Sequence, residues 1–156
     1  KVLVYEDTYL DNVFHIILTP GLWAFHMLEA WTRGSVWTGT GKVLGDWEDL
    51  KPRNEYAHQI TGAYYSARLG VLEHMDSMRR SGACLIWRDI GPEYWAPVGV
   101  WLIRETVREA MTRTPRQFDS LKHAIEYVSP RVSAPDDLRN SWFVKRGRQT
   151  RLDSFA

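Results

Sequence analysis

One aromatic residue and two arginines lie at a spacing in this chain that suits binding of a nucleic acid. Trp101, Arg104 and Arg108 are three and four residues apart, which on a helix puts them along one edge. An indole ring can stack on a base while guanidinium groups hold a phosphate. The alternative is that Trp101 lies in the core and the arginines pair with acids such as Glu105 or Glu109. The first interpretation predicts a nucleic-acid surface on this helix.

Three further residues join these candidates. Tyr65 and Arg68 lie beside the apolar stripe of a helix predicted over residues 60–80, whereas Tyr64 belongs to that stripe. Arg88 follows a buried strand predicted over residues 83–87. The nucleic-acid candidates are therefore Tyr65, Arg68, Arg88, Trp101, Arg104 and Arg108.

The same region also fits an enzyme acting on a phosphate substrate, such as a phosphodiesterase or nucleotide hydrolase. Clustered arginines and glutamates can form a phosphate pocket with an acid–base carboxylate. This alternative requires Arg88 to lie within reach of Glu93 and Glu105, with Arg104 beside them. The same charges equally make salt bridges, so no residue is assigned a catalytic role.

The last nine residues, RQTRLDSFA, form a short amphipathic segment. A single helical turn brings Leu152 and Phe155 to one side as an apolar plug, and the Gln149 amide can fill a small polar pocket before it. The basic residues around the motif would steer it toward an acidic partner; they are Lys145, Arg146, Arg148 and Arg151. Alternatively, the terminal leucine and phenylalanine pack back on their own domain. The first interpretation predicts a protein-docking motif that folds on binding.

Composition limits the remaining classes. A chain of 156 residues with 44% hydrophobic residues is one ordinary globular domain. Its net charge is +1 and fifteen of its twenty basic residues are arginine, which permits nucleic-acid contact without the strongly basic balance of a dedicated binder. The single Cys84 lies in an apolar run, and the five histidines show no metal-ligand spacing, so we expect no metal site or other cofactor in this chain. No run of about 18 apolar residues is present, and we expect no membrane contact.

The apolar pattern predicts an α+β (or α/β) domain. Strands are expected at residues 2–5, 13–18 and 83–87. A helix is expected over residues 20–33, with Thr19 as N-cap, Pro20 in the first turn and Gly34 after its end. Further helices are predicted over 60–80, from Pro97 to before Pro115, from Asp119 or Ser120 to Pro130, and after Pro135. Residues 35–58 are interpreted as a loop with a short strand at 35–38.

Several longer stretches resemble one family. YYSARLGVLEHM, RDIGPEYWAPVGVWLIRETVREAM and VFHIILTPGLWAFHMLEAW, followed by the QxxLxxF tail, are similar to the archaeal Nre family of DNA-repair proteins. The resemblance implies a role in DNA-damage repair linked to the replication sliding clamp (PCNA), but supplies no catalytic residue. Members of the family are longer and carry an amino-terminal four-cysteine zinc finger, so a chain starting at Lys1 is expected to be a carboxy-terminal portion. Ala156 departs from the clamp-binding pattern, where a second aromatic often stands.

We therefore predict a domain over residues 1–144 and a flexible basic tail over residues 145–156. The predicted function is that of a DNA-repair accessory protein in the archaeal cytoplasm, associated with the nucleoid. It binds the sliding clamp through Gln149, Leu152 and Phe155 and contacts DNA. The alternatives are the phosphate enzyme described above and a scaffold whose tryptophan-rich surface holds another protein.

Overall fold

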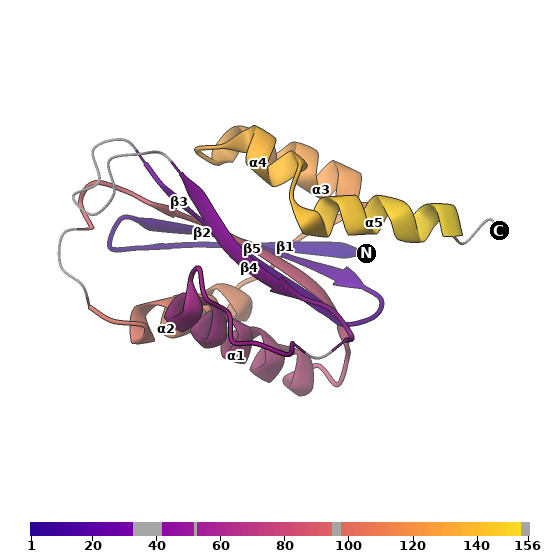
Figure 1. Ribbon diagram of the computed structural model, residues 1–156, viewed down its shortest axis with the longest axis horizontal. Helices are drawn as coiled ribbons and strands as arrows, with labels where there is room; N and C mark the ends of the chain where they lie inside the picture. The colour runs from indigo at the N-terminus through magenta and orange to yellow at the C-terminus, as the bar shows by residue number, and fades with distance from the viewer. Residues whose placement is uncertain (33–41, 52, 95–97, 154–156) are drawn as a thin grey trace.

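A six-stranded mixed sheet forms the middle layer of the protein, with helices on both faces (Figure 1). The computed structural model describes residues 1–32, 42–51, 53–94 and 98–153, with side chains as far as residue 147. The elements are β1 (Val2–Tyr9), β2 (Asn12–Pro20), β3 (Ala24–Trp31), β4 (Val43–Glu48), α1 (Thr61–Ser77), β5 (Gly82–Ile90), α2 (Trp101–Thr112), β6 (Arg116–Phe118), α3 (Leu121–Val128), the short 3₁₀ helix η1 (Ser129–Arg131), α4 (Pro135–Arg139) and α5 (Trp142–Asp153). The α+β class predicted from the sequence is confirmed.

The strand order is β4-β3-β5-β2-β1-β6. Two antiparallel hairpins, β1–β2 and β3–β4, follow each other along the chain, and β5 lies between them in the sheet. Strand β5 runs antiparallel to β2 and parallel to β3. The β1–β2 turn has positive φ at Leu10 (45°) and Asp11 (57°), the backbone of a two-residue hairpin turn. All nine residues of β5 are buried, as expected for a central strand covered on both faces.

The prediction of a helix over residues 20–33 is wrong, because most of this segment forms strand β3. Seven of the eight residues of β3 are buried, since the sheet face bearing Phe25 and Met27 packs on α1 and α2 and the opposite face lies under α5. A strand buried on both faces is apolar at successive positions and shows no alternation. Thr19 and Pro20, which suggest a helix start, are the last residues of β2.

Strand β4 lies within the segment predicted to be a loop, while the short strand suggested at 35–38 lies outside the described residues. Within β4, the side chain of Asp46 is buried and accepts hydrogen bonds from the backbone amides of Gln59 (3.0 Å) and Ile60 (2.9 Å). These amides precede α1, where a carboxylate is favourable. Strand β4 thereby fixes the start of α1.

Helices α1 and α2 cover one face of the sheet, and both are predicted from their apolar spacing. The buried stripe of α1 includes Tyr64, Ala67, Val71 and Met75, as expected. The two helices approach closely at Gly70, where an added Cβ would lie 3.0 Å from Cγ1 of Val107. This contact fixes the side of α2 that remains outside, where Trp101, Arg104 and Arg108 were predicted to act.

The other face is covered by α3, η1, α4 and α5 (Figure 1). The predicted start of α3 is confirmed, because Ser120 Oγ accepts a hydrogen bond from the backbone amide of His123 at 3.2 Å. Helix α5 begins at Trp142 and continues to Asp153, across the boundary predicted at residue 145. Its first turn is anchored in the core by the buried Phe143 and Val144. Across the described residues, none of the helices combines the length and apolar character needed to span a bilayer.

Candidate functional site

The predicted edge of α2 is solvent-exposed, but its charges are already compensated. Arg108 donates to Glu73 of α1 through Nε (2.7 Å) and Nη2 (2.6 Å), and to Glu105 through Nη1 (2.8 Å). Arg104 also donates to Glu105, at 3.1 Å. These hydrogen bonds lower the pKa of both glutamates. Trp101 is 45% exposed, so it is not the core residue of the alternative interpretation. The arginines, by contrast, make the salt bridges that this alternative predicts.

Arg68 on α1 binds the buried Glu48 of β4, and Tyr65 on the same helix binds the loop before it. This carboxylate accepts hydrogen bonds from Trp23 Nε1 (2.8 Å), the Tyr64 hydroxyl (3.0 Å) and Arg68 Nε (2.8 Å). Burial, together with the adjacent carboxylate, raises the pKa of Tyr64. The Tyr65 hydroxyl accepts the backbone amide of Ala57 at 3.1 Å. Both candidates thus tie α1 to the preceding loop and to β4.

Arg88 lies inside the protein, where it is 4% exposed. Its Nη1 donates to Glu29 of β3, and its Nε and Nη2 donate to Oδ1 of Asn12 at 2.9 and 2.6 Å. Asn12 in turn donates to the carbonyl oxygens of Tyr9 and Leu10 in the β1–β2 turn. Arg88 therefore holds three neighbouring strands together.

Among the described side chains, no hydrogen bond or ion pair joins Arg88 to Glu93 or Glu105. Arg88 pairs with Glu29, Glu105 pairs with the arginines of α2, and the Glu93 backbone amide donates to Asp11 Oδ2 at 2.8 Å. Sequence reasoning missed Glu29 because the helix assigned to that segment hid its place on a strand beside β5. Among the described residues, no group of three or more histidine, cysteine, aspartate or glutamate side chains is arranged to hold a metal ion.

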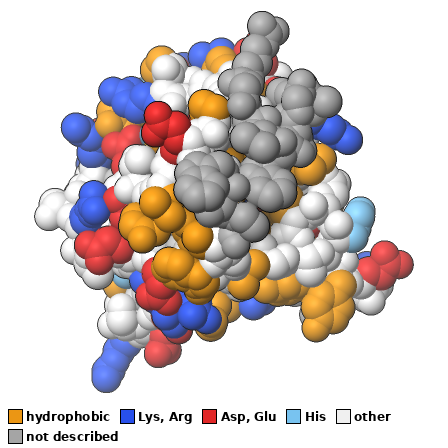
Figure 2. Space-filling model, turned by 90° about the vertical axis from the view of Figure 1, so that its left-hand side faces the viewer, with side chains coloured by type: hydrophobic (Ala, Val, Ile, Leu, Met, Phe, Trp, Pro, Cys, Tyr) orange, Lys and Arg blue, Asp and Glu red, His pale blue; other side chains and the backbone are white. Residues whose placement is uncertain are grey.

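The end of the molecule that carries the β1–β2 turn shows mixed charge as well. On the described part of this face, Figure 2 shows basic side chains lying beside acidic ones, with apolar side chains between them. Exposed apolar residues here include Tyr9 and Leu10 of the turn. The described part of this surface therefore lacks the one-sided positive charge that binds a phosphate backbone.

The tail motif is only partly within the described residues. The backbone at Gln149 and Leu152 is part of α5, whereas their side chains and the whole of Phe155 lie outside the description. The helix extends past the strands at the carboxy-terminal end of the molecule (Figure 1). The helical turn assumed for the motif is thus present in the backbone as far as Asp153.

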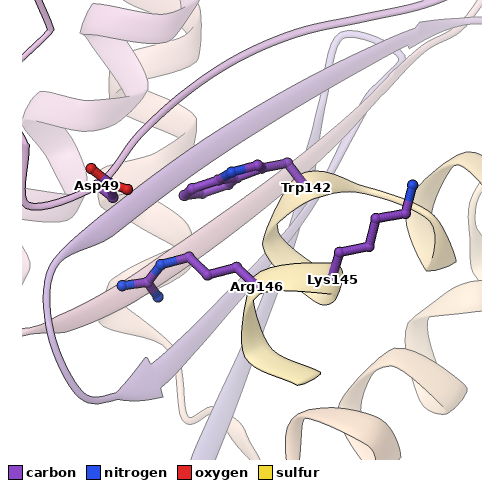
Figure 3. A pocket seen from close by; sticks show the side chains of 4 residues that line it. All are labelled: Asp49, Trp142, Lys145 and Arg146. Carbon is purple, nitrogen blue, oxygen red and sulfur yellow. The ribbon is translucent and has the colours of Figure 1, made fainter. Parts of the chain in front are cut away.

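A pocket beside α5 is a feature that sequence reasoning missed. It has a volume of about 480 Å³ and is lined by Asp49, Trp142, Lys145 and Arg146. Figure 3 shows Trp142 and Arg146 extending from α5 toward Asp49, while Lys145 points to the other side. The Trp142 ring stacks on Trp47 of β4, with centroids 4.2 Å apart and planes 14° apart. We call these five residues the α5 pocket. The sequence SWFVKR could have indicated this pocket, because its tryptophan precedes two basic residues by about one helical turn.

His26 lies under this pocket and is expected to make the fold sensitive to acid. Its ring meets Trp142 edge-on at 5.9 Å, and its buried Nδ1 has no hydrogen-bond partner among the described residues. Burial lowers the pKa of His26 to about 4, although Asp46 acts in the opposite direction. Between pH ~6.5 and ~4, this histidine binds a proton in the unfolded chain but stays neutral in the folded chain. Its contribution to the free energy of unfolding is therefore complete above pH ~6.5 and decreases as the pH falls toward ~4.

The expected loss is up to about 3 kcal/mol, measured as the free energy of unfolding in urea at pH 7 and pH 4. The variant His26→Gln should lose less than the wild type over this interval. His123→Gln, which changes an exposed histidine, should behave as the wild type. An identical pH dependence in all three proteins would show that His26 does not cause the effect.

Comparison with known proteins identifies the family of this chain. The family described as "Archaeal Nre, C-terminal" matches residues 48–155, and "Archaeal Nre, N-terminal" matches residues 1–38. The DNA repair protein NreA of Archaeoglobus fulgidus is 36% identical over 156 residues, which is 99% of this chain and 38% of that protein. NreA of Haloferax volcanii is 34% identical over 163 residues, again 99% of this chain and 38% of the relative.

A third relative, DNA repair protein NreB of A. fulgidus, is 36% identical over 159 residues, 99% of this chain and 40% of its own length. The chain thus spans about two fifths of the length of these relatives. No solved structure matches the chain at a significant level. The two family matches cover almost all of the sequence, and the chain belongs to the archaeal Nre family.

Proposed function

We propose that this chain acts in DNA repair as a binding module that docks on the replication sliding clamp (PCNA) through its carboxy-terminal motif. The relatives at 34–36% identity are named DNA repair proteins. The motif QTRLDSFA supplies an amide, an aliphatic and an aromatic residue at steps of three: Gln149, Leu152 and Phe155. A contact with DNA is part of the same proposal.

The observation that carries the clamp proposal is the position of the motif on α5. The first turn of this helix is held in the core by Phe143 and Val144, while its backbone continues past the sheet toward the motif (Figure 1). A recognition element on an extended helix can enter a groove of a partner without rearrangement of the domain. Lys145 and Arg146 precede it and would raise the rate of encounter with an acidic clamp surface.

The enzyme alternative receives no support from the described geometry. Its phosphate pocket depends on Arg88, which is buried and bonded to Asn12 and Glu29. The scaffold alternative differs from the clamp proposal in where the partner binds, since it uses the folded surface instead of the tail.

A competition experiment separates these two modes of binding. A peptide of residues 145–156 is expected to displace the whole chain from the sliding clamp in a calorimetric titration, because the proposal assigns all anchoring contacts to this segment. A peptide of the same composition in scrambled order serves as the control. If the whole chain binds the clamp and the native peptide fails to compete, the contact lies on the folded domain.

A further inference from the structure

We infer that the α5 pocket binds an unpaired base of single-stranded DNA together with its neighbouring phosphates. This inference rests on the proposed role in DNA repair and names a site for the DNA contact. The pocket differs from the edge of α2 in its stacked pair of indole rings, its charge and its place on the helix that carries the tail motif.

The aromatic part of the pocket is held in a fixed position. Trp142 stacks on Trp47 at 4.2 Å and meets His26 edge-on at 5.9 Å. Trp47 nevertheless remains 45% exposed, and Trp142 lines the open pocket. A stacked, accessible indole pair offers a flat surface to a base. Because all four bases can stack on an aromatic ring, this surface suits binding without sequence preference.

Charge in the pocket favours an anion. Two cations, Lys145 and Arg146, line it together with one acid, Asp49. Among the described side chains, Lys145 has no carboxylate partner, and Arg146 lies 5.8 Å from the Trp142 ring, at cation–π range. The α2 edge, by comparison, carries Arg104 and Arg108 together with Glu73 and Glu105, so its charges balance. The phosphate next to a stacked base would therefore find positive charge here that the α2 edge lacks.

The shape of the site selects single strands over duplex. In a duplex the faces of each base are covered by its neighbours, so stacking on Trp142 requires a base that is already unstacked or is extruded at a cost. Asp49 lies across from Trp142 and Arg146 (Figure 3) and can accept a hydrogen bond from an exocyclic amine of such a base. Arg146 also lines a second groove of about 790 Å³ between α5, α3 and the strand ends. A strand leaving the pocket thus has a path along the molecule.

The test measures binding of a fluorescently labelled 12-nucleotide single strand of mixed sequence, by anisotropy, in the absence of clamp. The variants are Trp47→Leu, which removes the exposed indole, and Lys145→Gln with Arg146→Gln, which removes two surface charges. The matched control is Arg104→Gln with Arg108→Gln. Circular dichroism checks that each variant is folded, and the charge variant keeps the test decisive should Trp47→Leu fail to fold.

Each pocket variant is expected to weaken single-strand binding at least about tenfold, whereas the control stays within about twofold of the wild type. Loss of two phosphate contacts should also reduce the slope of log K against log salt by about 1.4. A blunt duplex of the same sequence should bind more weakly than the single strand. Unchanged binding in both pocket variants, an equal loss in the control, or displacement of the DNA by a polyglutamate peptide at matched charge would overturn the inference.

This outcome is independent of the clamp proposal, because no clamp is present in the assay. Trp47→Leu is expected to bind the sliding clamp as the wild type does, since Trp47 is not part of the tail motif. A protein that binds the clamp but no single strand would therefore refute the DNA site alone.

Discussion

The double variant Leu152→Ala with Phe155→Ala is expected to lose its affinity for the sliding clamp while keeping its thermal stability. Burial of each side chain in a partner contributes roughly 1.5–3 kcal/mol before ordering costs, and a micromolar complex amounts to only about 8 kcal/mol in total. Removing both should weaken such a complex by at least about 100-fold. The melting temperature should stay nearly constant, because the proposal assigns both side chains to the partner.

The matched control for this variant replaces an exposed leucine and an exposed aromatic elsewhere. Leu69→Ala with Trp101→Ala makes the same kind of change on α1 and α2 and should leave clamp binding intact. Calorimetric titration of the clamp and a thermal melt of each protein give both readouts. Equal clamp affinity in the tail variant, or a large drop in its melting temperature, would indicate a packed terminus instead of a docking motif.

Replacing Glu29 by alanine is expected to destabilise the fold by about 3–5 kcal/mol, because it leaves the Arg88 guanidinium buried without its charge partner. Glu29 and Arg88 are 6% and 4% exposed, so water cannot take the place of the lost carboxylate without opening the sheet. The free energy of unfolding in urea at pH 7 measures the effect. Since small domains have about 5–15 kcal/mol of stability in total, this loss would remove a large part of the free energy of unfolding.

Two further variants test the physical reason for this loss. Glu29→Gln keeps an acceptor for Arg88 but removes the charge, so it should destabilise less than Glu29→Ala. Glu73→Ala removes one of the two glutamate partners of Arg108 on the surface, where Glu105 and water still compensate the guanidinium, and should change stability little. A small effect of Glu29→Ala, comparable to that of Glu73→Ala, would mean that the buried pair is readily hydrated.

Secondary structure could be predicted wherever local pattern and tertiary environment agree. Helix α1 has one buried stripe and a solvent-exposed side, so its apolar residues repeat with the helical period. Strand β3 could not be predicted in this way. Both of its faces are covered, so its apolar residues follow one another without a period. Strand β4 was hidden for a different reason. Its Gly45 and acidic residues suggest a loop. In the structure, however, Asp46 is buried and accepts a hydrogen bond from an amide that precedes α1.

The candidate sites differ in how far the sequence could define them. The family and the QxxLxxF motif are recognisable from local sequence alone. The partner of Arg88 was not predictable, since Glu29 lies 59 positions away and becomes its neighbour only through the parallel pairing of β3 with β5. The α5 pocket likewise combines Trp47 and Trp142 from distant segments. Such contacts depend on strand order, which periodicity does not encode.

The position of β5 in the sheet has a consequence for the order of folding. The hairpins β1–β2 and β3–β4 join neighbours in the chain and can form early, since they close only short loops. Strands β2 and β3 are consecutive in sequence but become joined only when β5, formed from residues 82–90, enters between them. Until then each hairpin leaves an apolar strand edge unpaired, which is a template for association with other chains. Because α1 directly precedes β5 and packs on the same sheet, we expect docking of this helix to bring β5 to the gap and to shorten the time during which these edges are exposed.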